Sequence, residues 1–336
     1  MTASTAAGPT AAGGRSGGLL SGRARYAVRK VSWAFGTLFF VVCFNFVLFR
    51  MLPGDPIGLY TRGRDMPSEQ IAALRERLSK PMGQQFLEYL SNPFASSINS
   101  VQFNTPVWQL IGERVWPTVL LAGTSIVIAS LAGVWIGVRS GWRRGSLFDK
   151  VSTGSTLTLY AMPEFWVGMV LMISLPFFPS GGISSPGVDT STPSGWLDVL
   201  WHMALPVASL SLVYLAEYAG IMRASLVDEL GQDYLTLARA KGLRDDLVRR
   251  NHAVPNALLP TMTLILVNLG FVIGGAITVE TVFSWPGLGL LSYQALRGPD
   301  IPLLQAVFLL FSTAVIVCTL LADLLYSVLD PRVSDS

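Results

Sequence analysis

Six long apolar runs divide this chain, and they constrain its fold more than any other feature. The first covers residues 31–52. The other five are centred on residues 117–138, 155–177, 202–222, 260–282 and 304–326. Each is close to the roughly 20 residues that a helix needs to cross about 30 Å of hydrocarbon. Because lipid offers no partner to an unpaired backbone group, each run must be helical. The sequence therefore predicts an all-α integral membrane protein with six transmembrane helices.

The composition agrees with a membrane protein and excludes several other classes. Hydrophobic residues make up 51% of the chain and charged residues only 13%, against roughly 25% in an average soluble domain. The net charge of +3 is too small to indicate nucleic-acid binding. Cys43 and Cys318 both fall in apolar runs, and His202 and His252 are far apart. Neither pair predicts a disulfide framework or a metal site.

The positions of Lys and Arg predict the orientation. Five of them lie in the first 30 residues, and others cluster after the second and fourth apolar runs, whereas residues 178–201 have none. Cytoplasmic loops carry such an excess, so we expect a multi-pass inner-membrane protein with both termini cytoplasmic. We divide it into a disordered basic tail (1–30), the first span (31–52), an extracytoplasmic segment (53–114) and a five-helix core (115–332) with a cytoplasmic loop at 233–255.

The 233–255 loop is the most informative stretch. Asp233 is a plausible N-cap for a helix over 234–241, and Gly242 fits the position after a helix that requires a positive φ. We expect a second short helix over about 245–253, with Asn256 capping the fifth span. The result would be a compact knob of apolar and cationic residues. Such a knob suits docking into a groove on another protein, but the residues alone equally allow an ordinary basic connector.

A family resemblance decides between these interpretations. The loop resembles the E-A-A-x-x-x-G permease signature of binding-protein-dependent ABC importers: Gly242 matches its glycine, Ala238 its second alanine, and Leu259-Pro260 its closing L-P. Thr236 and Leu237 depart from it. The oligopeptide, dipeptide and nickel branch is similar over residues 31–332, apart from 79–104. Further matching segments are Pro53–Pro56, Pro163–Trp166, Glu280–Gly289, Ala322–Tyr326 and Leu329–Arg332.

The resemblance implies the transmembrane domain of a type I ABC importer that forms half of the translocation pore. It also implies a second permease subunit, two ATPase subunits and an extracytoplasmic solute-binding protein. The chain has no G-x-x-x-x-G-K-[ST] loop. We therefore expect a non-catalytic subunit without a cofactor, with ATP and Mg²⁺ bound by the ATPase partners. The implied ATPase-coupling residues are Ala238, Arg239, Ala240, Lys241, Gly242, Leu243 and Arg244. Peptides are the implied solute, with nickel complexes and glutathione left open.

Acidic residues inside the apolar runs are further candidates. Glu164 lies beside Pro163, which should kink the third span, and Glu217 lies well inside the fourth. An ionisable group in a span costs at least about 2.5 kcal/mol unless it faces water or a partner. Both carboxylates could therefore line the translocation path. Hydrogen bonding between helices explains them equally well, and it is the simpler explanation for Asp323.

Two other classes of function were weighed. An ion-coupled secondary transporter would work alone and should show internal repeats with broken helices in both halves; the chain shows no such repeat. An intramembrane enzyme needs a nucleophile with its base, or metal ligands, at membrane depth. The two histidines provide neither.

Overall fold

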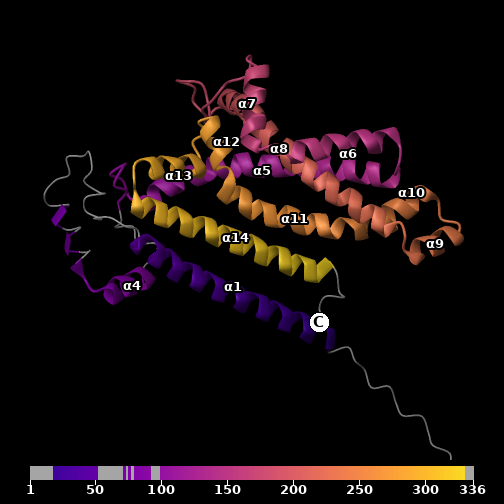
Figure 1. The fold of residues 1–336 in the computed structure, drawn as a ribbon, viewed down its shortest axis with the longest axis horizontal. Helices are drawn as coiled ribbons and strands as arrows, with labels where there is room; N and C mark the ends of the chain where they lie inside the picture. Colours follow the sequence, from indigo (N-terminus) through magenta and orange to yellow (C-terminus); the bar gives the residue numbers. More distant parts are fainter. Residues whose placement is uncertain (1–17, 52–70, 73–74, 77–78, 92–98, 330–336) are drawn as a thin grey trace, which may run out of the picture.

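The computed structural model describes residues 18–51, 71–72, 75–76, 79–91 and 99–329, and within them the regular structure is helical. Figure 1 shows the long helices lying side by side in one elongated bundle. The helices are α1 (Gly18–Arg50), α4 (Met82–Ser91), α5 (Val107–Trp142), α6 (Leu147–Tyr160), α7 (Glu164–Ser174), α8 (Pro193–Glu229), α9 (Asp233–Ala240), α10 (Asp245–Val248), α11 (Val254–Gly275), α12 (Ile277–Val282), α13 (Leu288–Arg297) and α14 (Ile301–Leu329).

Five of the described helices are long and apolar enough to cross a membrane on their own. They contain α1, α5, α8, α11 and α14. The expected third span, 155–177, is instead a broken pair, because α6 and α7 meet at an angle of 104°. Pro163 explains the break, since it has no amide hydrogen to donate and disfavours helical geometry in the residue before it. The predicted change of direction at Pro163 is thus present, but it is a full break in the helix. The α6–α7 pair supplies the sixth span if the two helices are counted as one span.

The N-terminal boundaries differ from the expected ones. Helix α1 begins at Gly18. Residues 18–30, which we expected to be part of a disordered tail, are therefore helical and continuous with the predicted first span. Residues 1–17 lie outside the described part of the chain. Much of the predicted extracytoplasmic segment, including 53–70 and 92–98, also lies outside it.

The described end of that segment is anchored to the last helix. Asp300, fully buried just before α14, accepts a hydrogen bond of 2.5 Å from the Ser100 hydroxyl and one of 2.9 Å from the Gln102 amide. Its other oxygen accepts from the Leu303 amide at 3.2 Å, which caps α14. The carboxylate therefore fixes the entry to α5 against the start of α14.

The fifth span also begins and ends differently from the expected 260–282. Helix α11 starts at Val254, directly after a π-helical turn, and ends at Gly275; Ile277–Val282 form the separate helix α12. Gly270 packs against α14 of the same chain, since a Cβ there would lie 2.9 Å from Cys318 Cβ. The small residue at 270 thus serves close packing of α11 on α14 within this chain.

A buried carboxylate ties α12 and α13 to α5. Glu280, with no exposed surface, accepts hydrogen bonds from the Thr118 hydroxyl at 2.7 Å and from the amides of Gly289 and Leu290 at 2.8 and 3.1 Å. The two amides belong to the first turn of α13, where unpaired N–H groups favour an anion. The Trp285 indole adds a 2.9 Å bond to the Pro117 carbonyl. These contacts give the 280–289 segment a structural role.

The most intimate helix contact joins α5 to α8 along three glycines spaced four residues apart. A Cβ on Gly137 would lie 2.6 Å from Met222 Cβ and 2.8 Å from the Ala219 carbonyl oxygen. Gly133 and Gly141 approach the α8 backbone in the same way, with Cβ distances of 2.9 and 3.1 Å to its carbonyl oxygens. Small residues at this spacing let two helix backbones pack closely. This glycine seam holds α5 and α8 in one register.

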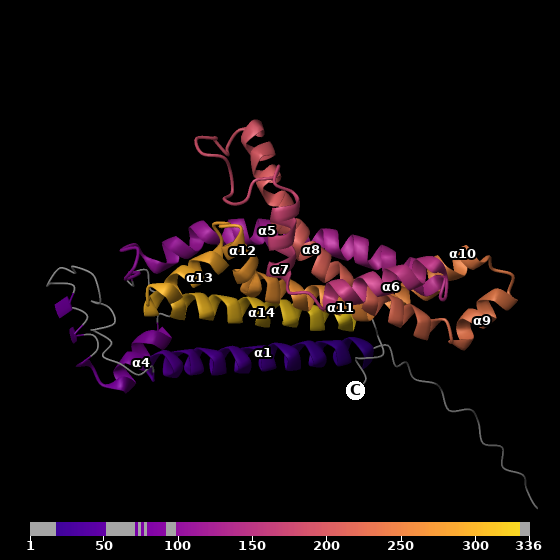
Figure 2. The same cartoon turned by 45° about the horizontal axis from the view of Figure 1, so that its top comes forward.

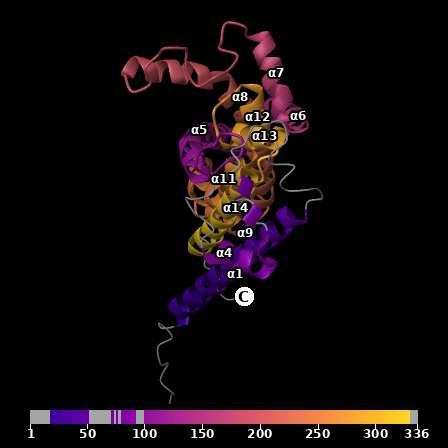
Figure 3. The same ribbon diagram turned by 90° about the vertical axis from the view of Figure 1, so that its left-hand side faces the viewer.

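Two features lie at the edge of the bundle. The first part of α8 and the loop before it project from the other helices (Figures 2 and 3). Helix α1 lies along the opposite side and packs mainly on α14. Its start and the end of α14 lie at the same end of the molecule as α9 (Figure 1), which we call the loop end.

We predict that Gly137→Ala will weaken the glycine seam. The added methyl group has no space, and forcing extra carbon into a packed contact typically costs about 1–3 kcal/mol. The midpoint of thermal unfolding of the purified protein in detergent should fall. Gly123→Ala is the matched control, because a Cβ at Gly123 on the same helix meets nothing within 4 Å. If the two variants unfold at the same temperature, the glycine seam does not stabilise the contact between α5 and α8.

Candidate functional site

The 233–255 loop forms a helix–glycine–helix knob at the loop end. Helix α9 ends at Ala240, and Gly242 follows with φ +83°. The Gly242 amide donates to the Arg239 carbonyl at 2.9 Å, and the Leu243 amide donates to the Ala238 carbonyl at 3.3 Å. This pair of bonds is the Schellman pattern that ends a helix on a left-handed residue. The predicted conformation of Gly242 is thus confirmed, whereas the N-cap position belongs to Gln232 and not to Asp233.

The second half of the knob is not a separate helix. Asp245–Val248 form α10, Arg249–Ala253 form a π-helical turn, and the chain continues without a break into α11. The expected helix over 245–253 is therefore the first part of the fifth long helix. Asn256 accordingly does not cap that helix, because it lies inside it.

Asn256 instead joins a polar network that ties α9 to its neighbours. Its side-chain amide donates to the Tyr234 hydroxyl at 2.8 Å and reaches Glu229 Oε1 at 3.4 Å. The Tyr234 hydroxyl also donates to Glu229 and lies 3.2 Å from the His252 carbonyl oxygen. Burial, and then the hydrogen bond to Glu229, raise the pKa of Tyr234 above its ordinary value. The network connects the end of α8, the start of α9 and the first turn of α11.

Apolar packing fixes the inner face of the knob to the bundle. Leu235, Ala238 and Val248 are buried in a cluster with Met222 and Leu226 of α8. Ala238, one of the seven predicted coupling residues, thus faces the bundle and not the surface. The knob has a packed base, so it can move only together with α8 and α11.

The outer face exposes apolar side chains among cations. The other six predicted residues, Arg239, Ala240, Lys241, Gly242, Leu243 and Arg244, are exposed. Tyr234, Leu237 and Leu247 join them, with Leu237 at 56%. These three residues are not among the predicted coupling residues. Helical spacing could have indicated Tyr234 and Leu237, because they lie one turn apart, on the helix face next to the one that carries Leu235 and Ala238.

Charged contacts orient the cationic side chains. Arg239 Nε lies 3.1 Å from Asp245 Oδ1, and Arg244 Nε lies 3.1 Å from Asp246 Oδ1. The guanidinium groups of Arg239 and Arg249 both lie about 6 Å from the centre of the Trp142 ring at the end of α5. Exposed ion pairs add little stability. The Arg239–Asp245 pair joins α9 to α10, whereas the Arg244–Asp246 pair lies within the second half of the knob.

The two predicted path residues lie far along the chain from this loop, and each has a partner. Glu217 on α8 accepts a 2.9 Å hydrogen bond from the Asn268 amide on α11. Glu164 begins α7, and its carboxylate accepts from the Thr278 hydroxyl on α12 at 3.1 Å. Tyr214, half-buried on α8, lies within electrostatic reach of both carboxylates. Asp323 forms a 2.9 Å ion pair with Lys30, which agrees with a helix–helix role.

Comparisons with known proteins now decide the family. The family model "Binding-protein-dependent transport system inner membrane component" matches residues 129–335, and the model of its N-terminal part matches residues 23–122. The chain belongs to this family. It is a permease of the ABC importer type, in the branch whose members are named as peptide permeases.

Curated relatives cover nearly the whole permease. The dipeptide transport system permease protein DppB of Escherichia coli K12 is 34% identical over 333 residues, covering 92% of this chain and 98% of its own. The glutathione permease protein GsiC of Pectobacterium atrosepticum is 35% identical over 311 residues, with the same coverage. The oligopeptide permease protein AppB of Bacillus subtilis is 32% identical over 322 residues, covering 92% and 99%.

A solved structure shares the fold of the permease. A chain of the MetNI methionine ABC transporter in an inward-facing conformation superposes with a TM-score of 0.54 at 17% identity, covering 67% of this chain and 98% of that one. The predicted type I importer fold is thereby confirmed. Family membership supports a multi-pass inner-membrane permease that works with ATPase and other subunits, and it does not support the ion-coupled alternative.

Proposed function

We propose that this permease imports di- or oligopeptides and forms half of the translocation pore. The names of three relatives support this proposal, since they specify dipeptide, glutathione and oligopeptide transport. Glutathione is itself a tripeptide, so the three names share one solute chemistry. A second permease subunit completes the pore, and an extracytoplasmic solute-binding protein delivers the peptide.

The knob at 233–255 is the docking element for an ATPase subunit. One observation carries this proposal: an exposed apolar and cationic face stands on a base that is packed into the bundle. Exposed apolar residues on a rigid helix are what a groove on a partner binds. Two ATPase subunits, one for each permease, bind ATP and Mg²⁺, and this chain needs no cofactor of its own.

Continuity of the helices explains how docking would drive transport. Helix α8 ends at Glu229, four residues before α9, and α10 passes without a break into α11. A shift of the knob is therefore a shift of α8 and α11, in the manner of rigid helices that slide against their neighbours. These are also the two helices that Glu217 and Asn268 join.

The loop end faces the cytoplasm in this proposal. Residues 1–30, 139–152, 223–255 and 330–336 are cytoplasmic, as the excess of Lys and Arg in the first three of them favours. The start of α1 and the end of α14 lie at the same end as the knob, which agrees with both termini on one side.

Glu164 and Glu217 line the path. Both are only partly buried, and each accepts one hydrogen bond from a neutral donor. Among the residues that the structure describes, neither carboxylate forms an ion pair. A carboxylate in such a setting can meet the ammonium group of a peptide. Because a charged group is costly in hydrocarbon, each carboxylate must face water or protein and not lipid.

Gly242→Val tests the docking proposal. A Cβ at Gly242 meets nothing else in this chain within 4 Å, so within the permease the variant acts through its left-handed backbone, which costs a β-branched residue roughly 1–2 kcal/mol. We expect normal amounts of permease in the membrane, severalfold less ATPase co-purified with it, and reduced peptide uptake in reconstituted complexes.

Gly242→Asn is the matched variant, because asparagine tolerates this conformation far better. It should keep most of the binding and uptake. If both variants behave as the native protein, the loop is only a connector. Equal loss in both would show that the backbone conformation at Gly242 does not explain docking.

Glu217→Gln and Glu217→Leu test the path. Glutamine can still accept the bond from Asn268, so assembly should stay normal while uptake of cationic peptides falls. Leucine leaves the Asn268 amide buried without its acceptor, which costs about 1–3 kcal/mol, and should lower both assembly and uptake. Glu113→Gln, an exposed acid on α5, controls for loss of charge. Intact assembly and uptake in Glu217→Leu would exclude the path role.

A further inference from the structure

Four cations gather where α5 is followed by α6, in a segment that we call the α5–α6 corner (residues 139–150). They are Arg139 in the last turn of α5, Arg143 and Arg144 in the connecting loop, and Lys150 near the start of α6. All four residues are exposed. Because the end of α5 contacts two arginines of the knob, the α5–α6 corner belongs to the loop end of the bundle.

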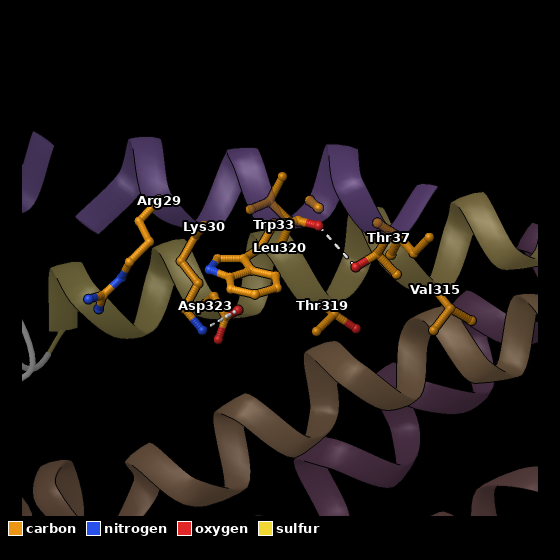
Figure 4. Close-up of a pocket in the computed structure, with 10 residues that line it drawn as sticks. Arg29, Lys30, Trp33, Thr37, Val315, Thr319, Leu320 and Asp323 are labelled. Atoms are coloured by element: carbon orange, nitrogen blue, oxygen red, sulfur yellow. Dashed lines mark hydrogen bonds and ion pairs between the residues drawn. The ribbon is translucent and has the colours of Figure 1, made fainter. Parts of the chain in front are cut away.

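The four charges have no counter-charge in the part of the chain that the structure describes. None of the four cations forms an ion pair there. Asp149, the only acid in residues 139–150, binds Arg223 of α8 with both carboxylate oxygens, at 2.5 and 3.0 Å. Lys30 shows the contrast: beside a cavity between α1 and α14, its Nζ lies 2.9 Å from Asp323 Oδ2 (Figure 4). The α5–α6 corner therefore carries positive charge that an anion can meet.

Arg139 is held in place by two aromatic rings. Its guanidinium carbon lies 5.8 Å from the centre of the Trp135 ring on α5 and 5.0 Å from the centre of the Phe148 ring on α6. The two rings meet edge to face, with their centres 6.1 Å apart. Such cation–π contacts position the guanidinium, and no oxygen acceptor binds this side chain among the described residues. Its five N–H donors are thus presented at a fixed point without an oxygen partner in the described chain.

The level of Arg139 in the membrane follows from the sequence of α5. Residues 115–138 carry no charge, and they give a helical rise of about 36 Å, enough to cross about 30 Å of hydrocarbon. Arg139 therefore lies where the hydrocarbon ends and the headgroups begin. Leu131 and Trp135 precede it at intervals of four residues, which places the three on one helix face, and they are 70% and 59% exposed. An exposed apolar stripe thus leads from Arg139 into the hydrocarbon layer.

We propose that the α5–α6 corner binds an anionic phospholipid, with the phosphate at Arg139 and an acyl chain along Trp135 and Leu131. A phospholipid has both the negative head and the apolar tail that this surface complements, and basic clusters at the ends of transmembrane helices attract anionic headgroups. A soluble subunit could meet the cations, but it could not reach an apolar stripe at hydrocarbon depth. The net positive charge favours an anionic lipid over a zwitterionic one.

Native mass spectrometry of the assembled transporter, given one lipid at a time in detergent, tests the site. Phosphatidylglycerol should bind at least about fivefold more tightly than phosphatidylcholine, and Arg139→Gln should remove about fivefold of that affinity, the size expected for one basic residue beside anionic headgroups. Arg25→Gln is the matched control, because Arg25 is an exposed arginine on α1, away from the α5–α6 corner. It should leave binding unchanged.

A second pair of variants separates the rings from the charge. Trp135→Leu keeps the stripe apolar but removes one of the two rings that hold Arg139, so it should weaken phosphatidylglycerol and leave phosphatidylcholine unchanged. Trp33→Leu, at a 71% exposed position of α1, should change neither. Soluble glycerol 3-phosphate should not compete, because it lacks the acyl chain.

Four results would overturn the proposal. They are equal binding of the two lipids, equal weakening by Arg25→Gln and Arg139→Gln, displacement of the lipid by glycerol 3-phosphate, and unchanged lipid binding in Arg139→Gln. If that last result comes with less ATPase co-purified with the permease, the α5–α6 corner is a protein contact and not a lipid site.

Discussion

The close contact of α5 with α8 is the constraint on which the rest of the permease depends. Gly133, Gly137 and Gly141 bring the two backbones together, and hydrocarbon supplies no hydrophobic force that would do so in their place. The seam ends at Trp142, which meets Arg239 and Arg249 of the knob. The position of the outer face of the knob therefore depends on the packing of these two membrane helices.

The break between α6 and α7 complements this rigid pair. At Pro163 the chain turns through 104°, and α7 packs against α8 and α12. Glu164, directly after the proline, thereby meets Thr278, and Ser209 of α8 donates to its backbone carbonyl at 2.6 Å. The start of α7, which carries one candidate path residue, is thus attached to α8, the helix that carries the other candidate, Glu217.

The sequence allowed much of this to be predicted, and the misses have physical reasons. Apolar length located the spans, and glycine's tolerance of a positive φ located the end of α9 at Gly242, because both depend on local rules. The size of the turn at Pro163 could not be predicted, since a proline permits a kink or a break and tertiary packing decides. Asn256 was predicted to be a cap because a local pattern cannot include its actual partner, Tyr234, which is 22 residues away in the sequence. The burial of Ala238 likewise depends on its packing against α8, which a local sequence pattern does not include.

Photo-crosslinking from Leu243 in the assembled transporter tests most directly whether the knob binds an ATPase subunit. Leu243 is 38% exposed on the knob, and Leu197, 69% exposed in the projecting part of α8, provides the reference. If the knob docks, a photoreactive residue at 243 will capture the ATPase subunit and one at 197 will not. Capture from 197 alone, or from neither position in a complex that hydrolyses ATP, would contradict docking at this loop.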